Sequence, residues 1–389
     1  MVIRSHRSIA LRATATLLGV AFVIGACTGG STPGPATTEP SESPRGASPA
    51  TPSGVPTLAP TPEATAPGPT PAPLPTTGAW TRLAPSGDAP SKREDQTWTV
   101  DPDAGTAWLF GGRNGGTTYG DLWAYDLASD TWSQIVPIGP APPARFGHDA
   151  TWVPGRGLII FGGQANATTF FGDLWQFDPR TLRWTTLAAA GALPKARYGS
   201  CAALGPDGRL WMSHGFTEDG TRFADTRAYD FTTGLWTDVT PAGVGPVERC
   251  LHSCWWTPDG RFVLYAGQTT GIDSLGDLWV LSPGAGDAPG TWAKATIDRP
   301  PDRNLYAVSP FRDTVVVVGG RGLGKTFLDD VYVVDPITSA FHAVALAGAG
   351  PAGRGGAALI DDPGRGRLLL FGGKDATGAV EDIWALTLR

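Results

Sequence analysis

Basic clusters, cysteine and catalytic motifs are all scarce in this chain of 389 residues. Lysine and arginine number 30 against 36 acidic residues, which gives a formal net charge of −6, and no lysine or arginine run occurs after residue 78. This balance makes nucleic acid an improbable partner. No hydrolase elbow, phosphate-binding loop or HExxH helix is present. We therefore assign no catalytic residue, expect no metal or cofactor, and do not make an enzyme the leading prediction.

Long apolar runs are also lacking. One short apolar stretch, Leu17 to Ile24, follows Arg4, Arg7 and Arg12 and is too short to span a bilayer comfortably. A positively charged segment followed by a short apolar segment is typical of a secretory signal peptide. The small residues Gly25 and Ala26 before Cys27 resemble the bacterial lipobox, which implies cleavage before Cys27 and a diacylglyceryl anchor on its sulfur. The alternative is an ordinary secretory signal with an incidental cysteine.

The composition then divides the chain into three parts. Residues 1–26 form the expected signal peptide. Residues 27–78 are rich in proline, threonine and serine with almost no aromatic residues, which predicts a disordered tether. Residues 79–389 combine aromatic, glycine and turn residues and form the globular part. We expect an extracytoplasmic lipoprotein, held to the bacterial cell membrane only through its lipid.

An internal repeat dominates the globular part. An arginine recurs every 51 to 54 residues, at Arg93, Arg145, Arg197, Arg249, Arg303 and Arg354. An aspartate recurs every 52 or 53 residues, at Asp121, Asp173, Asp225, Asp277, Asp330 and Asp382. A Gly-Gly pair stands between them in four repeats and becomes His214-Gly215 and Ala266-Gly267 in the other two. A tryptophan follows the aspartate at Trp132, Trp184, Trp236 and Trp292, with Phe341 in the fifth repeat.

Each repeat contains four short apolar or alternating runs separated by turn residues, which predicts a four-stranded antiparallel meander. Its Gly-Gly pair and spaced tryptophan resemble the kelch repeat. Six copies imply an all-β fold, a six-bladed β-propeller. The last repeat ends after its third strand, and residues 80–83 before the first repeat supply the missing strand. We therefore expect the N-terminal strand to close the last blade.

The six repeated arginines are the first candidate ligand-binding residues. The resemblance places them at the start of the channel-lining strands, and in several kelch proteins the arginine at this position binds carboxylates. The alternative is that each arginine pairs with an aspartate or with backbone carbonyls and ties the blades together. Both interpretations stay open, and they apply to Arg93, Arg145, Arg197, Arg249, Arg303 and Arg354.

Positions where the repeats differ are the second set of candidates. Three residues after each arginine stand Gln96, His148, Ser200, His252, Tyr306 and Ala357, and one residue further on stand Thr97, Asp149, Cys201, Ser253, Ala307 and Ala358. We expect both sets to line the channel. His148 and His252 are candidate ligand-binding groups, and together with Asp149 they are candidate acid–base groups or metal ligands. The two histidines lie two blades apart, too far to share one metal ion, so no metal site is predicted.

Three cysteines fall in the globular part. Cys250 and Cys254 are four residues apart on one predicted strand, roughly 13 Å when extended, and cannot bond each other. Cys201 could instead reach Cys254 on the next blade, since a disulfide is allowed outside the cytoplasm. Three buried thiols are the alternative.

The leading functional hypothesis is a monomeric binding module for protein or glycan ligands at the channel mouth, with the loop from Ser282 to Thr291 as a possible partner contact. The alternative is a cofactor-free sugar mutarotase or epimerase, because six-bladed extracytoplasmic sialic-acid mutarotases resemble this chain. Its candidate acids are Glu94 and Glu248, each beside a repeated arginine. A copper site like that of galactose oxidase has no counterpart in the sequence. A surface scaffold without a small ligand is the third hypothesis.

Overall fold

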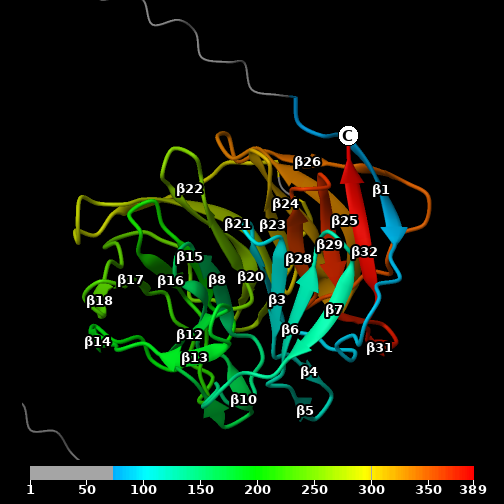
Figure 1. Ribbon diagram of the computed structural model, residues 1–389. Helices are drawn as coiled ribbons and strands as arrows, with labels where there is room; N and C mark the ends of the chain where they lie inside the picture. Colours follow the sequence, from blue (N-terminus) through cyan, green and yellow to red (C-terminus); the bar gives the residue numbers. More distant parts are fainter. Residues whose placement is uncertain (1–72, 299) are drawn as a thin grey trace, which may run out of the picture. The chain divides into compact units, whose positions relative to one another are not determined.

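The computed structural model describes residues 73–298 and 300–389, which build six mainly antiparallel sheets of four or five strands, arranged in a ring, and three small two-stranded sheets (Figure 1). The expected signal peptide, Cys27 and nearly all of the tether lie outside the described residues. The six-bladed propeller predicted from the repeat is confirmed. Among the described residues, no helix is long and apolar enough to cross a membrane.

Each blade orders its strands from the channel outward. Blade 1 contains β2 (Thr97–Asp101), β3 (Thr106–Phe110), β6 (Leu122–Asp126) and β7 (Thr131–Ile135). Blade 2 contains β8 (Asp149–Val153), β9 (Gly157–Phe161), β12 (Leu174–Asp178) and β13 (Arg183–Thr186). Blade 3 contains β15 (Cys201–Leu204), β16 (Leu210–Ser213), β17 (Thr226–Asp230), β18 (Leu235–Asp238) and the outer β14 (Ala190–Gly191).

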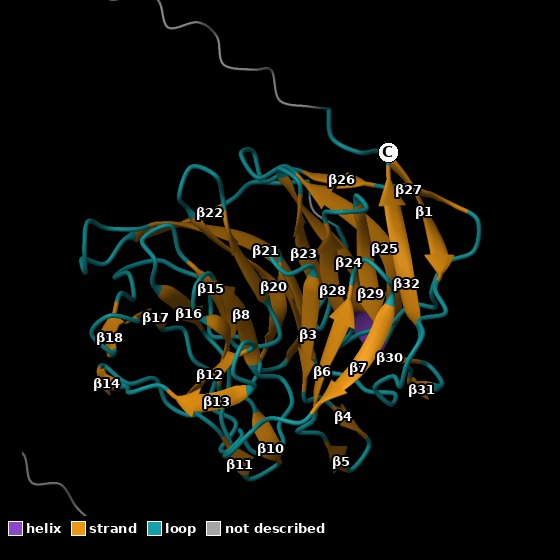
Figure 2. Cartoon of the chain, viewed as in Figure 1, coloured by secondary structure: helices purple, strands orange, loops and turns teal. Residues whose placement is uncertain are grey.

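Blades 4 and 5 have longer central hairpins than the other blades (Figure 2). Blade 4 contains β19 (Ser253–Trp256), β20 (Phe262–Thr269), β21 (Ile272–Ser282) and β22 (Thr291–Lys294). Blade 5 contains β23 (Ala307–Phe311), β24 (Thr314–Arg321), β25 (Phe327–Val334) and β26 (Phe341–Ala343), with the 3-10 turn η1 (Leu323–Lys325) at its hairpin tip. Blade 6 contains β28 (Ala358–Asp362), β29 (Arg367–Phe371), β32 (Ile383–Leu388), β1 (Thr77–Arg82) and β27 (Ala345–Ala347).

Closure of the ring follows the prediction. The N-terminal strand β1 pairs antiparallel with β32, from Gly78 opposite Leu388 to Arg82 opposite Trp384 (Figure 1). Trp80 on β1 is 7% exposed and packs in the cluster shared by blades 5 and 6. The first and last parts of the globular chain therefore share one sheet, and the edge of β32 is covered.

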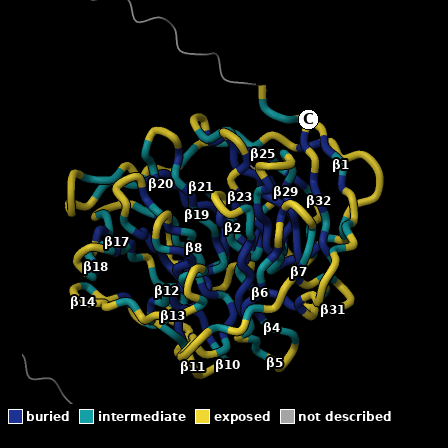
Figure 3. The backbone as a smooth tube through the Cα atoms, viewed as in Figure 1, coloured by how far each residue is buried: buried dark blue, intermediate teal, exposed yellow. Residues whose placement is uncertain are grey.

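The core lies between neighbouring blades, as the burial pattern in Figure 3 shows. The ring of Trp98 stacks on Trp132 within blade 1, with centroids 5.4 Å apart, and Trp132 contacts Phe371 of blade 6 at 5.3 Å. The repeated tryptophans thus fill the space between blade faces. Burial of such large rings dominates the energetics of a core of this kind.

Two faces of the propeller can be distinguished by their loops. The loops between the second and third strands, including the short hairpins β4–β5 (113–118), β10–β11 (164–170) and β30–β31 (374–379), lie at the end of the channel where the repeated arginines stand. We call this end the arginine face. The turns between first and second strands, and between third and fourth strands, lie on the opposite face.

The Gly-Gly pair of each repeat allows close approach of backbones near the channel. Gly111 has a φ of +66°, and a side chain there would meet the carbonyl oxygen of Arg145 in the next blade at 2.4 Å. Glycine alone fits such a position without displacement. His214 and Ala266, which replace the first glycine in two repeats, hold the same left-handed conformation at φ 58°.

Candidate functional site

The six repeated arginines are structural joints inside the blades. Each is at most 4% exposed and forms two hydrogen bonds, 2.5 to 3.2 Å long, with the carboxylate of the aspartate in its own repeat. Its Nη1 also donates to the carbonyl of the first residue of the Gly-Gly position, and its Nε donates to the carbonyl two residues upstream.

These contacts occupy four of the five N–H groups of each guanidinium. None of the six arginines lies among the residues that line the channel cavity. The observed arrangement matches the alternative in which each arginine pairs with an aspartate and backbone carbonyls, but these contacts lie within one blade and do not tie neighbouring blades together. The partner aspartates are further held by an indole N–H two residues on, at 2.7 Å in four repeats.

Burial alone would raise the pKa of these aspartates. The hydrogen bonds and charge of the arginines outweigh burial, so the pKa lies below its usual value for Asp121, Asp173, Asp225, Asp277 and Asp382. They remain ionised through the neutral range, which keeps each arginine–aspartate joint intact.

The channel is narrowed by a closed ring of backbone hydrogen bonds. Two residues after each arginine, the chain takes a left-handed conformation, with φ between 53° and 67°. Each N–H in this ring donates to the carbonyl of the equivalent residue one blade back, at 2.7 to 3.2 Å, through Asp95, Gly147, Gly199, Leu251, Leu305 and Gly356. The sequence analysis missed this ring, although glycine at three of the six positions was a visible signal.

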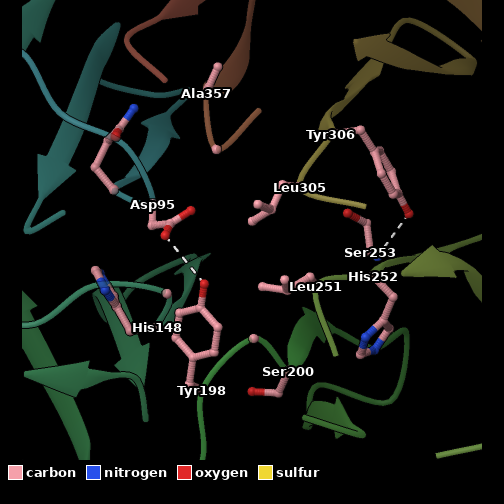
Figure 4. Close-up of a pocket in the computed structure, with 14 residues that line it drawn as sticks. Asp95, His148, Tyr198, Ser200, Leu251, His252, Ser253, Leu305, Tyr306 and Ala357 are labelled. Atoms are coloured by element: carbon pink, nitrogen blue, oxygen red, sulfur yellow. Dashed lines mark hydrogen bonds between the residues drawn. The ribbon is translucent and has the colours of Figure 1, made fainter. Parts of the chain in front are cut away.

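The cavity at this ring has a volume of about 130 Å³. The six positions three residues after the arginines all line the cavity, as Figure 4 shows for five of them by label: His148, Ser200, His252, Tyr306 and Ala357. The sixth, Gln96, donates its amide to the carbonyl of Phe371 at 3.1 Å in blade 6. Of the six positions one residue further on, only Ser253 lines the cavity, so that half of the expectation was wrong for the other five, because neighbouring residues on a strand point to opposite sides.

The lining histidines are buried and neutral. The Nε2 of His148 lies 2.8 Å from the Thr97 hydroxyl, and its Nδ1 has no partner among the described residues. Burial, with the charge of Arg145, lowers the pKa of His148 to about 3. Burial, with the nearby His214 ring, lowers the pKa of His252 well below its usual value. Within residues 73–298 and 300–389, no three potential ligands gather around a metal position.

Polar side chains in the lining connect consecutive blades. The Ser200 hydroxyl donates to Oδ2 of Asp149 at 2.5 Å, and burial raises the pKa of Asp149 to about 7. The Tyr306 hydroxyl accepts from the N–H of Ser253 at 2.9 Å (Figure 4). These contacts join blade 2 to blade 3 and blade 4 to blade 5.

A disulfide joins blade 3 to blade 4. Cys201 and Cys254 form the bridge considered from the sequence, with their Cα atoms 5.8 Å apart. Cys250 remains a free, buried thiol, and burial raises its pKa.

An acidic pair stands on the arginine face of the channel. Asp95 accepts a hydrogen bond from the Tyr198 hydroxyl at 3.3 Å (Figure 4). It also forms an ion pair with Arg113 at 3.0 Å. Glu94 lies 3.5 Å from the Arg113 Nε. Burial raises the pKa of both carboxyl groups, although the Arg113 charge opposes it. Glu248, the other candidate acid, is exposed and does not line the cavity.

The insertion from Ser282 to Thr291 in blade 4 packs against blade 3. Arg209 of blade 3 donates to the Asp287 carboxylate at 2.7 Å and to the Gly286 carbonyl at 3.0 Å. This loop therefore bridges blades 3 and 4, a role that its length alone did not indicate.

The geometry defines a β-propeller of kelch-type repeats with a narrow, polar channel. A family model described as the KLHDC2/KLHL20/DRC7 kelch-repeats domain matches residues 74–267. The chain belongs to the kelch-repeat family, since six repeats, their motif contacts and this match agree.

Curated proteins similar to this chain include kelch domain-containing proteins and a protein phosphatase. Kelch domain-containing protein 3 of Bos taurus is 29% identical over 66% of this chain and 73% of its own length. The Homo sapiens protein of the same name is 28% identical over the same shares. Serine/threonine-protein phosphatase BSL2 of Arabidopsis thaliana is 27% identical over 66% of this chain, and the match spans 27% of that protein's length.

Proposed function

We propose that this propeller is an interaction module that binds a protein partner on the arginine face, around the channel mouth. The observation that carries the proposal is a break in symmetry. In every repeat the arginine is bonded to the aspartate of its own blade, whereas the residue that follows the arginine differs in each blade. These residues bridge to an equally variable set on the hairpins, in the pairs Glu94–Arg113, Phe146–Gln164, Tyr198–Phe216, Cys250–Gln268, Asn304–Arg321 and Gly355–Lys374.

The variable pairs divide the arginine face by chemistry. Aromatic rings gather at blades 2 and 3, where the half-buried rings of Phe216 and Phe170 lie 5.5 Å apart and contribute to the surface. The rings of Phe146 and Tyr198, 5.7 Å apart, are buried. Cationic side chains stand on blades 1, 5 and 6. Aromatic and arginine side chains are the groups that most often dominate protein interfaces. A surface with one aromatic and one cationic sector favours a partner with a defined orientation.

The test places a photo-crosslinking amino acid at either face of one blade. Leu323, at the blade 5 hairpin of the arginine face, is 60% exposed, and Ile337, at the opposite face of the same blade, is 59% exposed. We expect the same discrete crosslinked species from position 323 in independent cultures and none from position 337. Equal crosslinking at both positions, or none at either, would remove the support for partner binding on this face.

We also propose that the module is extracytoplasmic and lipid-anchored through Cys27, as a monomer. The Cys201–Cys254 disulfide supports an oxidising compartment, since such bonds are rare in a reducing cytoplasm. The wild-type chain is expected to partition into detergent with the membrane fraction. A Cys27→Ser variant should leave that fraction, and unchanged partitioning of this variant would contradict the lipid anchor.

A second candidate function is sugar mutarotation at the same mouth. Glu94 and Asp95 favour it, because two adjacent carboxyl groups stand at the channel mouth and burial raises the pKa of both, the direction that suits a general acid. NMR exchange between the anomers of N-acetylneuraminate should be faster with the wild-type chain than with an Asp95→Asn variant. An exchange rate equal to that of buffer would exclude this activity for the substrate tested.

A further inference from the structure

A pocket between blades 4 and 5 on the arginine face contains polar groups without partners. It has a volume of about 250 Å³ and is lined by Gln268, Asp273, Asn304, Arg321, Gly322 and Lys325. Asn304 and Arg321 are the blade 5 pair among the variable pairs described above. Asn304 follows the repeated arginine, and Arg321 follows the Gly-Gly pair. It is separate from the channel cavity, with which it shares no lining residue.

Asn304 presents a fixed acceptor to this pocket. Its side chain amide donates to the Asp273 carbonyl at 2.6 Å and to the Ser274 hydroxyl at 3.1 Å. The Ser274 hydroxyl in turn donates to the Arg321 carbonyl, so it can only accept from Asn304, which sets the orientation of the amide. Asn304 is 4% exposed, and its Oδ1 has no partner among the described residues. A buried acceptor of this kind is costly unless a ligand or water donates to it.

Cationic groups stand at the same pocket. Arg321 has a buried Nε without a partner, and neither Arg321 nor Lys325 makes an ion pair among residues 73–298 and 300–389. The equivalent pair in blade 1 differs, because Arg113 is neutralised there by Glu94 and Asp95. Replacement of the acid by Asn304 in blade 5 leaves the Arg321 charge available at the pocket. The charge of Arg321 also reaches the Glu94 and Asp95 carboxyl groups, though at longer range.

These groups together select the chemistry of a ligand. A simple anion would satisfy Arg321 and Lys325 but would leave the Asn304 oxygen and the exposed Asp273 carboxylate without donors. A neutral sugar would donate to both acceptors but would leave the cations unpaired. A sugar that carries a carboxylate supplies both, since a planar carboxylate matches a guanidinium and ring hydroxyls donate to carbonyl and carboxylate oxygens. A pocket of this size suits a single ring.

We propose that this pocket binds the uronic-acid class of sugar, with its carboxylate at Arg321 and Lys325 and its hydroxyls at Asn304 and Asp273. The site deepens the proposed binding function of the arginine face by naming a ligand, but it requires no protein partner. Failure of the crosslinking experiment would therefore leave it standing, and its own failure would leave the protein partner standing. The ligand is either free uronate or a uronate residue of a polysaccharide.

The test is NMR or calorimetric titration of the purified full-length chain with galacturonate and a galacturonate trimer. Galactose lacks the carboxylate, and cyclohexanecarboxylate keeps the ring and carboxylate without hydroxyls. We expect saturable binding of galacturonate or of the trimer, at least about tenfold tighter than of either control. Preference for the monomer indicates a free ligand, and preference for the trimer indicates a polysaccharide. Equal affinity for cyclohexanecarboxylate and the uronates, or no binding at about 10 mM ligand, would overturn the proposal.

Two variants locate the site. Arg321→Gln should weaken uronate binding by about tenfold, because a charge-assisted contact is lost. Lys325→Asn removes the second positive charge of the pocket. Lys325 lies in an exposed turn with a φ of 63°, a conformation that asparagine tolerates. This variant therefore still tests the site if Arg321→Gln does not fold. Lys294→Ala, which removes an exposed charge from the outer strand β22, is the matched control and should bind as wild type. Unchanged affinity in both pocket variants would refute this location.

Discussion

Ser200 and Asp149 join blades 3 and 2 through a hydrogen bond of 2.5 Å, beside the residues that line the channel. Asp149 as a residue is only half-buried, but its carboxyl group points away from water, and burial raises its pKa to about 7. The folded protein therefore holds a proton on Asp149 that the unfolded chain releases at a lower pH. This contribution to stability is present in acid and is lost as the pH rises from about 4 to about 7.

An Asp149→Asn variant tests this relationship. The amide is neutral at every pH and can still accept from Ser200, so the variant should be more stable than wild type at pH 8, by on the order of 3 kcal/mol. The gain should vanish near pH 4, where Asp149 is protonated in the folded wild type as well. Urea denaturation at both pH values measures it. A pH-independent difference would show that Asp149 is ionised in the folded protein.

His148 should act in the opposite direction. Its pKa falls from the ordinary 6.5 to about 3 in the folded chain, so its contribution is present above about 6.5 and is lost as the pH falls toward 3. Between pH 7 and pH 5 the stability advantage of wild type over a His148→Gln variant should shrink by about 2 kcal/mol. Denaturation curves at the two pH values test this. An unchanged advantage would mean that His148 titrates normally.

The arginine–aspartate joints should matter far more to stability than exposed ion pairs. Arg145→Met removes the two Arg145 hydrogen bonds to Asp173 and its bond to the Gly162 carbonyl, so Asp173 keeps only the Trp175 indole as a side-chain donor, and we expect a loss of about 3 kcal/mol in the free energy of unfolding. Arg180→Ala is the control, because the Arg180–Asp178 pair is exposed and its removal should have no measurable effect. Similar small changes in both variants would contradict a structural role for Arg145.

The disulfide between blades 3 and 4 should stabilise the ring. Cys201 and Cys254 are 53 residues apart, and the chain-entropy model gives about 4 kcal/mol for a loop of this length. A Cys201→Ala, Cys254→Ala variant should therefore unfold at lower urea than wild type, whereas Cys250→Ala should change the midpoint less. Thiol titration of the denatured chain should gain two thiols after reduction. An unchanged midpoint in the double variant would contradict this contribution.

Closure by the N-terminal strand can be tested at Trp80. Its side chain is 7% exposed between blades 5 and 6, so Trp80→Ala should cost about 3 kcal/mol or more. Thr81, the next residue on β1, is exposed, and Thr81→Ala should be close to wild type. Calorimetric melting of the two variants gives the comparison. Equal melting temperatures would indicate that β1 does not hold the ring closed.

The repeated part of the architecture was readable from the sequence because each feature is local and occurs several times. Turn residues, strand alternation and spaced tryptophans act within about 50 residues, and their recurrence indicated six blades and the incomplete last repeat. The channel-lining positions three residues after the arginines, from Gln96 to Ala357, were also located correctly, since a fixed distance from the repeated arginine places each residue at the same height in its blade. The next positions were not, apart from Ser253.

Contacts between blades were decided only by tertiary structure. The sequence alone left two roles open for the repeated arginines, because it could not show that their aspartates, 27 or 28 residues later, return to within hydrogen-bonding distance. It likewise could not show the left-handed backbone ring. Asp95 and Leu251 adopt positive φ values in this ring, which the identity of these residues does not predict. The pocket at Asn304 and Arg321 depends on two hairpins meeting across neighbouring blades. Periodicity therefore determined the blades of this protein, whereas packing between them determined which polar groups are satisfied and which remain free to bind.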